Sequence, residues 1–232
     1  MKTIADWIYD IITAKVSLNE GLEKMAKILE NDILNEVIKE LNNMINNEKT
    51  ALVVVDVQND FVNGALGSPE AEAIVPLVCE YIQNFKGKYI AVTQDCHSEK
   101  GYEEYIEGQR IPFHCGMGTD GIELNADVEK ALEEKIKDGT HINWFYKNTF
   151  GSTALAKEML GVIRKEKIET IIIIGLCTDI CVISNALILR ASFPWTRIVV
   201  LEDLCAGSSP ANHQAALEIM SANCIDIWSY HN

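Results

Sequence analysis

Residues 175–182 read Gly-Leu-Cys-Thr-Asp-Ile-Cys-Val and place a cysteine where it could act as a nucleophile. They follow the apolar run 171–174 and precede a helical pattern at 184–190. Cys181 is therefore expected in the first turn of a helix, capped by Thr178 or Asp179, just beyond a buried parallel strand. Open α/β sheets bind ligands at that edge, and the positive end of a helix favours a thiolate.

Other reactive side chains follow the remaining strand patterns. Asp56 ends the first apolar run, Asp95 and His97 follow the second, and Lys147 follows the third. The carboxyl ends of parallel strands meet at one edge of a sheet, so an acid, a lysine and a thiol should converge there. This is a constellation for covalent catalysis. Each residue alone also has a structural explanation, as a turn cap, a surface charge or a core thiol.

The chain has seven cysteines, an odd number without the spacing of a small disulfide scaffold, which indicates free thiols in a reducing compartment. Cys79 lies on an amphipathic helical pattern, and Cys224 is expected at the opposite edge of the sheet. Cys205 follows the fifth strand pattern and competes with Cys181 as nucleophile, whereas Cys177 falls in the loop before the helix. Only Cys181 combines the expected edge with a helix start.

A second group of candidate ligands surrounds two histidines. A zinc site with four Cys and His ligands would combine Cys96, His97, His114 and Cys115. Neighbouring side chains on an extended segment point to opposite faces, which argues against Cys96 and His97 binding one metal. Asp95, His97 and His114, with Glu107 seven residues earlier, would suit Zn, Mn or Fe(II). Spacing alone leaves hydrogen-bonded loop histidines equally open.

From residue 51 onward, strand and helix patterns alternate, which predicts an α/β fold with a parallel sheet and helices on both faces. The strand patterns are 51–57, 89–93, 142–146, 170–174, 197–201 and 225–228, and the helical ones are 75–85, 126–137, 153–164, 178–190 and 210–222. The long irregular stretch 94–123 is expected to carry function.

Residues 1–49 have a helical pattern throughout. Ser17 and Glu20 form a capping-box pattern, and an almost heptad apolar stripe runs from Leu22 to Met44. The segment is interpreted as a helical hairpin packed on the main domain, with a dimerisation arm as the alternative. A chain without it is expected to keep the α/β fold and to change oligomeric state or solubility.

The chain has 232 residues and a net charge of −14, which argues against nucleic acid or an anionic membrane as partner. No apolar run is long enough to span a membrane, and Asp6 and Asp10 interrupt any signal-peptide core. A cytoplasmic location is expected.

Four segments together resemble the isochorismatase-like cysteine hydrolases: 54–61 (VVDVQNDF), 93–97 (TQDCH), 147–152 (KNTFGS) and 175–182. The resemblance covers 51 to about 228. It divides the chain into an N-terminal helical extension, 1–49, and a hydrolase domain, 50–232, and implies a Rossmann-like six-stranded parallel sheet.

The resemblance also implies a catalytic triad of Asp56, Lys147 and Cys181. Cys181 would attack a carboxamide carbon, Asp56 would carry the proton to the leaving ammonia and then activate water, and Lys147 would lower the thiol pKa. The backbone N–H groups of Cys177 and Cys181 would form the oxyanion hole, beside a cis peptide at Leu176–Cys177.

Among family members, Asp95, His97, His114 and Glu107 match the metal pattern of nicotinamidases, in which the metal binds the pyridine nitrogen. The chain departs from that pattern at Cys96 and at 111–113, where many nicotinamidases have tryptophan. Phe61, Trp144 and Tyr146 are expected to face the aromatic ring.

The expected activity is hydrolysis of nicotinamide to nicotinate and ammonia by a homo-oligomer with a divalent metal, zinc first and Mn or Fe as alternatives. Two other interpretations stay open. One is a metal-free hydrolase of another small amide or a vinyl ether, and the other is a non-catalytic assembly protein that uses the N-terminal helices.

Overall fold

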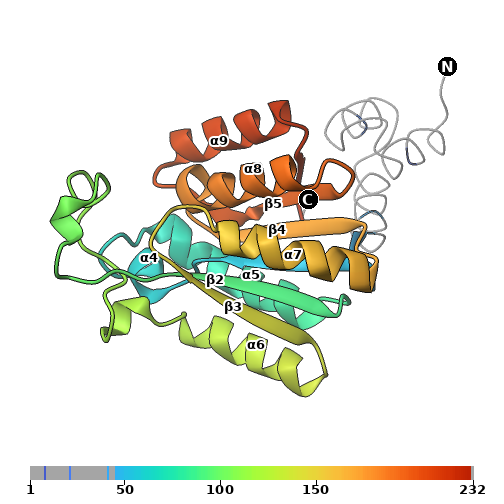
Figure 1. Cartoon of the computed structure of the whole chain (residues 1–232), viewed down its shortest axis with the longest axis horizontal. Helices are drawn as coiled ribbons and strands as arrows, with labels where there is room; N and C mark the ends of the chain where they lie inside the picture. Colours follow the sequence, from blue (N-terminus) through green and yellow to red (C-terminus); the bar gives the residue numbers. More distant parts are fainter. Residues whose placement is uncertain (1–7, 9–20, 22–40, 42–44, 231–232) are drawn as a thin grey trace.

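The computed structural model describes residues 8, 21, 41 and 45–230, and its arrangement is drawn in Figure 1. Most of the predicted N-terminal helical extension lies outside the described residues. In the part of the chain that is described, no helix is long and apolar enough to cross a membrane.

Six parallel strands form one sheet in the order β3-β2-β1-β4-β5-β6, as the alternating patterns predict. The strands are β1 (Thr50–Val55), β2 (Tyr89–Asp95), β3 (His141–Lys147), β4 (Thr170–Leu176), β5 (Arg197–Ala206) and β6 (Asp226–Trp228). The strand order changes direction between β1 and β4, and open α/β sheets place their ligand sites at such a switch point.

Helices cover both faces of the sheet (Figure 1). One face carries α5 (Pro69–Asn84) and α6 (Ala126–Lys137), and the other carries α7 (Thr153–Glu166), α8 (Ile183–Ser192) and α9 (Pro210–Ala222). Serine side chains cap three of these helices: Ser68 Oγ accepts from Ala71 N–H at 3.1 Å, Ser152 Oγ from Leu155 N–H at 3.1 Å, and Ser209 Oγ from Asn212 N–H at 3.2 Å.

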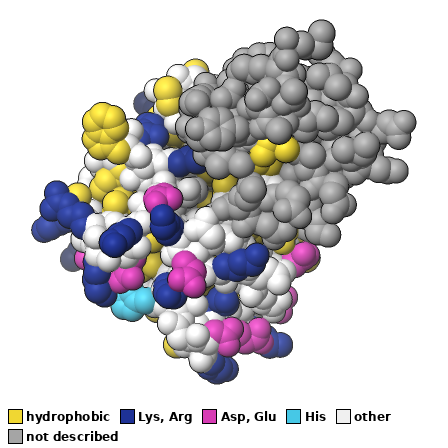
Figure 2. Space-filling view, turned by 90° about the vertical axis from the view of Figure 1, so that its right-hand side faces the viewer, with side chains coloured by type: hydrophobic (Ala, Val, Ile, Leu, Met, Phe, Trp, Pro, Cys, Tyr) yellow, Lys and Arg dark blue, Asp and Glu magenta, His cyan; other side chains and the backbone are white. Residues whose placement is uncertain are grey.

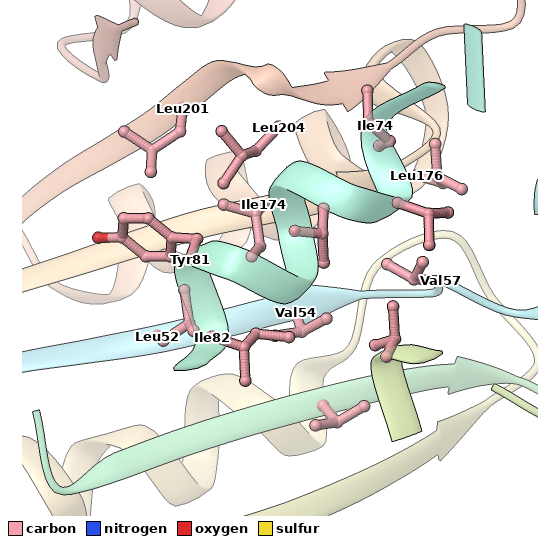
Figure 3. Packing of buried hydrophobic residues seen from close by; sticks show 14 of the residues in the cluster. Leu52, Val54, Val57, Ile74, Tyr81, Ile82, Ile174, Leu176, Leu201 and Leu204 are labelled. Atoms are coloured by element: carbon pink, nitrogen blue, oxygen red, sulfur yellow. The ribbon is translucent and has the colours of Figure 1, made fainter. Parts of the chain in front are cut away.

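The central strands are apolar along their whole length because both faces are covered. Every residue of β1 and β4 is buried. Figure 3 shows one face of this core, where Tyr81 and Ile82 of α5 pack over Leu52, Val54 and Ile174. The buried sheet supplies the rigid base from which the loops at its carboxyl edge project.

The segment just before β1 also belongs to this core. Leu41 and Ile45 are buried, and both pack in the cluster under α5. The amide of Asn46 donates to Asn84 O at 3.2 Å, and its oxygen accepts from Lys86 N–H at 2.8 Å. Packing against the sheet domain thus begins before residue 50.

The structure adds three local features to the predicted fold. The predicted helix 178–190 divides into a π-helical turn, Thr178–Val182, and α8. A short helix after the first strand, α4 (Asn59–Val62), was not predicted. β3 lies at the edge of the sheet and alternates between exposed and buried residues.

One face of the described part of the chain carries charges of both signs. On the face that Figure 2 turns to the viewer, Lys and Arg side chains lie among Asp and Glu side chains.

Candidate active site

The predicted triad lies together at the carboxyl edge of the sheet. Asp56 follows β1, Lys147 ends β3, and Cys181 lies in the π-helical turn after β4. Lys147 Nζ lies 2.7 Å from Asp56 Oδ2 and 3.7 Å from Cys181 Sγ. Thr93 Oγ1 donates to the other Asp56 oxygen at 2.6 Å. All three triad side chains are buried, so their charges act on one another with little screening by water.

Burial and charge shift the ionisation of this group. Burial raises the pKa of Asp56, while Lys147 acts in the opposite direction. Burial and then Asp56 raise the pKa of the Cys181 thiol well above its usual value, and Lys147 lowers it. Burial lowers the pKa of Lys147, but the negative groups around it, Asp56, Cys181 and Asp95, together raise that pKa above its usual value. The free site therefore favours a protonated thiol beside a lysine cation, in contrast to the thiolate expected from the helix start.

The turn that carries Cys181 has a different construction from the one predicted. The Leu176–Cys177 peptide is cis, as the family resemblance implies. The carbonyl of Cys177 accepts from the N–H groups of Ile180 and Val182, at 3.1 and 3.0 Å. Gly175 has φ 122°, and a Cβ there would lie 2.1 Å from the Val55 carbonyl oxygen. Only glycine lets β4 approach β1 so closely before the turn.

Neither predicted cap binds the start of this turn. Thr178 Oγ1 instead lies 2.8 Å from His213 Nδ1 of α9. Asp179 accepts from Ser208 N–H at 2.8 Å and from its hydroxyl at 2.5 Å. Both side chains therefore connect the turn to α9 and to the loop before α9, and neither of them caps the turn.

The second predicted group also converges. Nitrogen and oxygen atoms of Asp95, His97, Glu107 and His114 all lie within 4.8 Å of one another. His97 Nε2 and His114 Nε2 lie 3.4 Å from different oxygens of Asp95, and 3.6 and 3.7 Å from Glu107 Oε1. Cys96 and Cys115 do not belong to the cluster, which agrees with the argument from strand geometry.

The atoms of this cluster fit a bound cation. Asp95 Oδ1, His97 Nε2 and Glu107 Oε1 are buried and have no hydrogen-bond partner among the described residues. His114 Nδ1 lies 2.9 Å from the Pro112 carbonyl, which can only accept, so Nε2 carries the lone pair that faces the cluster. Buried polar atoms left without partners are costly, and a metal ion would satisfy them together.

One cavity of about 320 Å³ connects the two groups. Cys181 and Cys177 line it together with Asp95, Glu107 and His114. Phe61 also lines the cavity and packs edge-on against the His114 ring, with 5.2 Å between centroids. A flat aromatic ligand bound here would lie beside a buried thiol and a cluster of possible metal ligands.

A family model described as an isochorismatase domain matches residues 50–230. The chain belongs to the isochorismatase family. The uncharacterised isochorismatase family protein PncA of Bacillus subtilis is 31% identical over 176 residues, which cover 73% of this chain and 92% of that protein. The nicotinamidase of Escherichia coli is 29% identical over 195 residues, covering 74% and 91%.

A solved structure agrees with the family assignment. The pyrazinamidase of Pyrococcus horikoshii in complex with zinc superposes with a TM-score of 0.61 at 30% identity. The superposition covers 78% of this chain and 99% of that one. The six-stranded isochorismatase fold predicted from sequence is thereby confirmed.

Two predicted substrate-binding residues of this isochorismatase-family chain lie elsewhere. Trp144 and Tyr146 are 40% and 63% exposed and line a separate groove with residues of α6, whereas Phe61 lines the cavity. Because β3 is an edge strand, their side chains point toward α6 and solvent. The assignment of Trp144 and Tyr146 to the aromatic substrate is therefore wrong.

Three buried or partly buried polar side chains hold the site and were not predicted. Gln58 accepts from Asp95 N–H at 2.6 Å and donates to Asp95 O at 2.8 Å. Asn185 donates to Cys181 O at 2.9 Å and accepts from Ser152 N–H at 2.9 Å. Asp60 accepts from Cys115 N–H at 2.7 Å. Gln58 and Asp60 stood in a quoted motif, but their partners lie far away in sequence.

The other cysteines considered as nucleophiles, apart from Cys177, are buried in a strand or lie away from the cavity. Cys205 lies inside β5 and is fully buried, and burial raises its pKa to about 12. Cys79 is half-buried on α5, and Cys224 is exposed. Apart from Cys181, only Cys177 lines the cavity among the described cysteines.

Proposed function

We propose that this chain is a metal-dependent nicotinamidase that hydrolyses nicotinamide to nicotinate and ammonia through a thioester on Cys181. The observation that carries the proposal is the single cavity that joins the Asp56–Lys147–Cys181 group to a cluster of orphaned ligand atoms. The nicotinamidase of Escherichia coli, at 29% identity over most of both chains, supports the substrate.

The first half of the reaction forms the thioester. The Cys181 thiol gives its proton to Asp56 as Sγ attacks the carboxamide carbon, and a C–S bond forms. Lys147 stabilises the thiolate and favours the ionised form of Asp56, against the effect of burial. The backbone N–H groups of Cys177 and Cys181 are proposed to hold the oxyanion. Asp56 then passes its proton to the nitrogen as the C–N bond breaks and ammonia leaves.

The second half returns the enzyme to its starting state. Asp56 takes a proton from water, whose oxygen attacks the thioester carbon. The C–S bond breaks, Cys181 regains a proton from Asp56, and the carboxylic acid product leaves and loses its own proton to water to become the carboxylate. One buried carboxylate thus serves as base and acid in turn, which suits a group whose pKa is raised by burial.

Asp95, His97, Glu107 and His114 would hold the divalent metal, for which zinc is the first candidate. The zinc complex of the Pyrococcus horikoshii pyrazinamidase supports this choice. A metal held by these residues would act as a Lewis acid and would orient the pyridine ring. Phe61, on the same cavity wall, would pack against the ring face or edge.

The test is ammonia release from nicotinamide by the full chain, before and after dialysis against a chelator, with zinc restored afterwards. The proposal expects turnover that falls on chelation and returns with zinc. The variant Cys181→Ser should lose nearly all turnover. Full activity in metal-free protein would refute the metal-dependent part, and activity in Cys181→Ser would refute the thioester.

A further inference from the structure

The cavity in front of Cys181 is larger than one pyridine carboxamide requires. A cavity of about 150 Å³ accommodates benzene. A pyridine carboxamide has about half as many heavy atoms again, which scales to roughly 225 Å³. The observed volume is about 320 Å³. The metal ion proposed at Asp95, Glu107 and His114 would fill part of this difference, roughly the 30 Å³ of one water, and the rest leaves space for a small further substituent.

The lining of the cavity is mainly apolar, with few charges. Both of its acidic residues, Asp95 and Glu107, belong to the cluster of metal-type ligands. Arg110 is the only Lys or Arg among the described residues that line it. Among the described lining residues outside the cluster, Arg110 thus carries the one charge, and it is positive, although the whole chain carries a net charge of −14.

Arg110 has no partner that explains its position. Its backbone N–H donates to Glu107 O at 2.8 Å, which fixes the loop between Glu107 and His114. Its side chain is exposed and makes no hydrogen bond or ion pair with the residues that the structure describes. Glu107 Oε1 faces the two imidazoles instead. Arg110 lines the cavity and is exposed, and a planar guanidinium is suited to bind a carboxylate or phosphate through two hydrogen bonds.

We infer that Arg110 forms an anion subsite, so that the preferred substrates are aromatic carboxamides that carry a second, negatively charged group. This inference rests on the proposed amidase function and narrows its substrate class. The reacting amide would lie at Cys181, the ring beside Phe61, and the carboxylate or phosphate at Arg110. Unsubstituted nicotinamide would enter the same cavity and leave the guanidinium without a ligand.

The kinetic test compares nicotinamide with a panel of pyridine carboxamides that carry a carboxylate or phosphate at each remaining ring position. We expect at least one anionic amide to have a higher kcat/KM than nicotinamide in the full-length enzyme. Arg110→Gln should lower kcat/KM for that amide by about tenfold or more, the loss expected for a charge-assisted contact. Its effect on nicotinamide should be at least about fivefold smaller.

Lys100→Gln is the matched control, because Lys100 is another exposed cation of the same long loop and does not line the cavity. Lys100→Gln should change kcat/KM by no more than about twofold for either nicotinamide or the anionic amide. A preference of the wild type for nicotinamide over every anionic amide would overturn the inference. Equal proportional losses on both substrates in Arg110→Gln would do the same.

A binding experiment separates this inference from the proposed function. Pyridine dicarboxylates contain no amide and cannot be hydrolysed, so calorimetry with them reads the subsite even if nicotinamide is not a substrate. The wild type and Lys100→Gln should bind at least one of them about tenfold more tightly than Arg110→Gln does. Equal binding by all three proteins would overturn the anion subsite, whether or not ammonia is released from nicotinamide.

Discussion

Cys181 lies between two charges that act on its thiol in opposite directions. Asp56 and burial raise the thiol pKa, and Lys147 lowers it. A helix start alone would favour a thiol that is already deprotonated before the substrate binds, whereas this buried thiol retains its proton in the free protein. Asp56 is then the natural acceptor when a substrate carbonyl arrives.

Two substitutions should shift the ionisation of Cys181 in opposite directions. Asp56→Asn removes a negative charge, so the thiol pKa should fall and alkylation by iodoacetamide should begin at lower pH. Lys147→Gln removes a positive charge, so alkylation should require higher pH. The measurement is the rate of Cys181 labelling from pH 6 to about 10, by mass spectrometry.

Both variants should lose most of their turnover, although only one of them has a more acidic thiol. Shifts in the same direction would mean that local rearrangement, and not charge, controls the thiol. Preferential labelling of Cys205 or Cys96 in the wild type would show that Cys181 is not the nucleophile.

The metal-type cluster makes a separate prediction. His97→Ala and His114→Ala should each bind much less divalent metal than the wild type, which should hold about one ion per chain. In both variants, KM for nicotinamide should rise by a larger factor than the rate of Cys181 alkylation falls, because the metal would orient the substrate and is not the nucleophile. His141→Ala, at the exposed start of β3, is the control and should keep its metal. Full metal content in the double variant, measured by mass spectrometry, would contradict the assignment.

At the scale of elements, the loop after Lys147 and the turn around Cys181 are joined by one side chain. Asn185 of α8 is fully buried and binds Cys181 O, Ser152 N–H and Phe150 O. Asn185→Ala would leave the Ser152 N–H without its buried partner. It should cost about 1–3 kcal/mol of unfolding free energy and lower kcat more than it raises KM.

Asn223→Ala is the comparison, since Asn223 makes an exposed amide contact at the end of α9. It should alter thermal unfolding and kcat little. If Asn185→Ala were destabilised with unchanged kcat, Asn185 would serve stability alone and would not position the nucleophile.

The exposed face of β3 should be dispensable for catalysis. Trp144→Ala and Tyr146→Ala should keep kcat/KM for nicotinamide within about twofold, because both residues line the groove beside α6. Phe61→Ala, which opens the cavity wall, should raise KM severalfold. The measurement is the steady-state kinetics of the three variants. A large loss of kcat/KM in Trp144→Ala would indicate that Trp144 does contact the substrate.

The contrast between β1 and β3 explains what the sequence could predict. The continuous apolar run of β1 indicates burial on both faces, and it correctly located Asp56 at the carboxyl edge. The alternating pattern of β3 gives no information on which face meets the substrate, so Trp144 was misplaced. The side chains of Gln58 and Asn185 form hydrogen bonds to segments that are distant in the sequence. A local sequence pattern does not indicate which distant groups they bind.

At the scale of the whole molecule, the division at residue 49/50 stays a prediction, but the core begins earlier. Leu41→Ala and Ile45→Ala should each cost about 2–5 kcal/mol, because each leaves a cavity in the cluster under α5. Leu160→Ala, on the exposed face of α7, should cost little. Urea unfolding of the full chain provides the comparison.

If Leu41→Ala and Ile45→Ala unfolded like the wild type, the segment before β1 would contribute nothing to the core. The predicted homo-oligomer and cytoplasmic location depend on different measurements, light scattering and cell fractionation.

Lys147 has a consequence for the design of inactive variants. Its ammonium lies 2.7 Å from Asp56 Oδ2 and 3.4 Å from Asp95 Oδ1, so it has two carboxylate partners. Removing one partner of a buried ion pair usually leaves an uncompensated charge and costs about 3–5 kcal/mol of stability. Here Asp56→Asn leaves Lys147 paired with Asp95. Asp56→Asn should therefore fold and turn over little substrate, which makes it the variant to crystallise with an amide in the cavity.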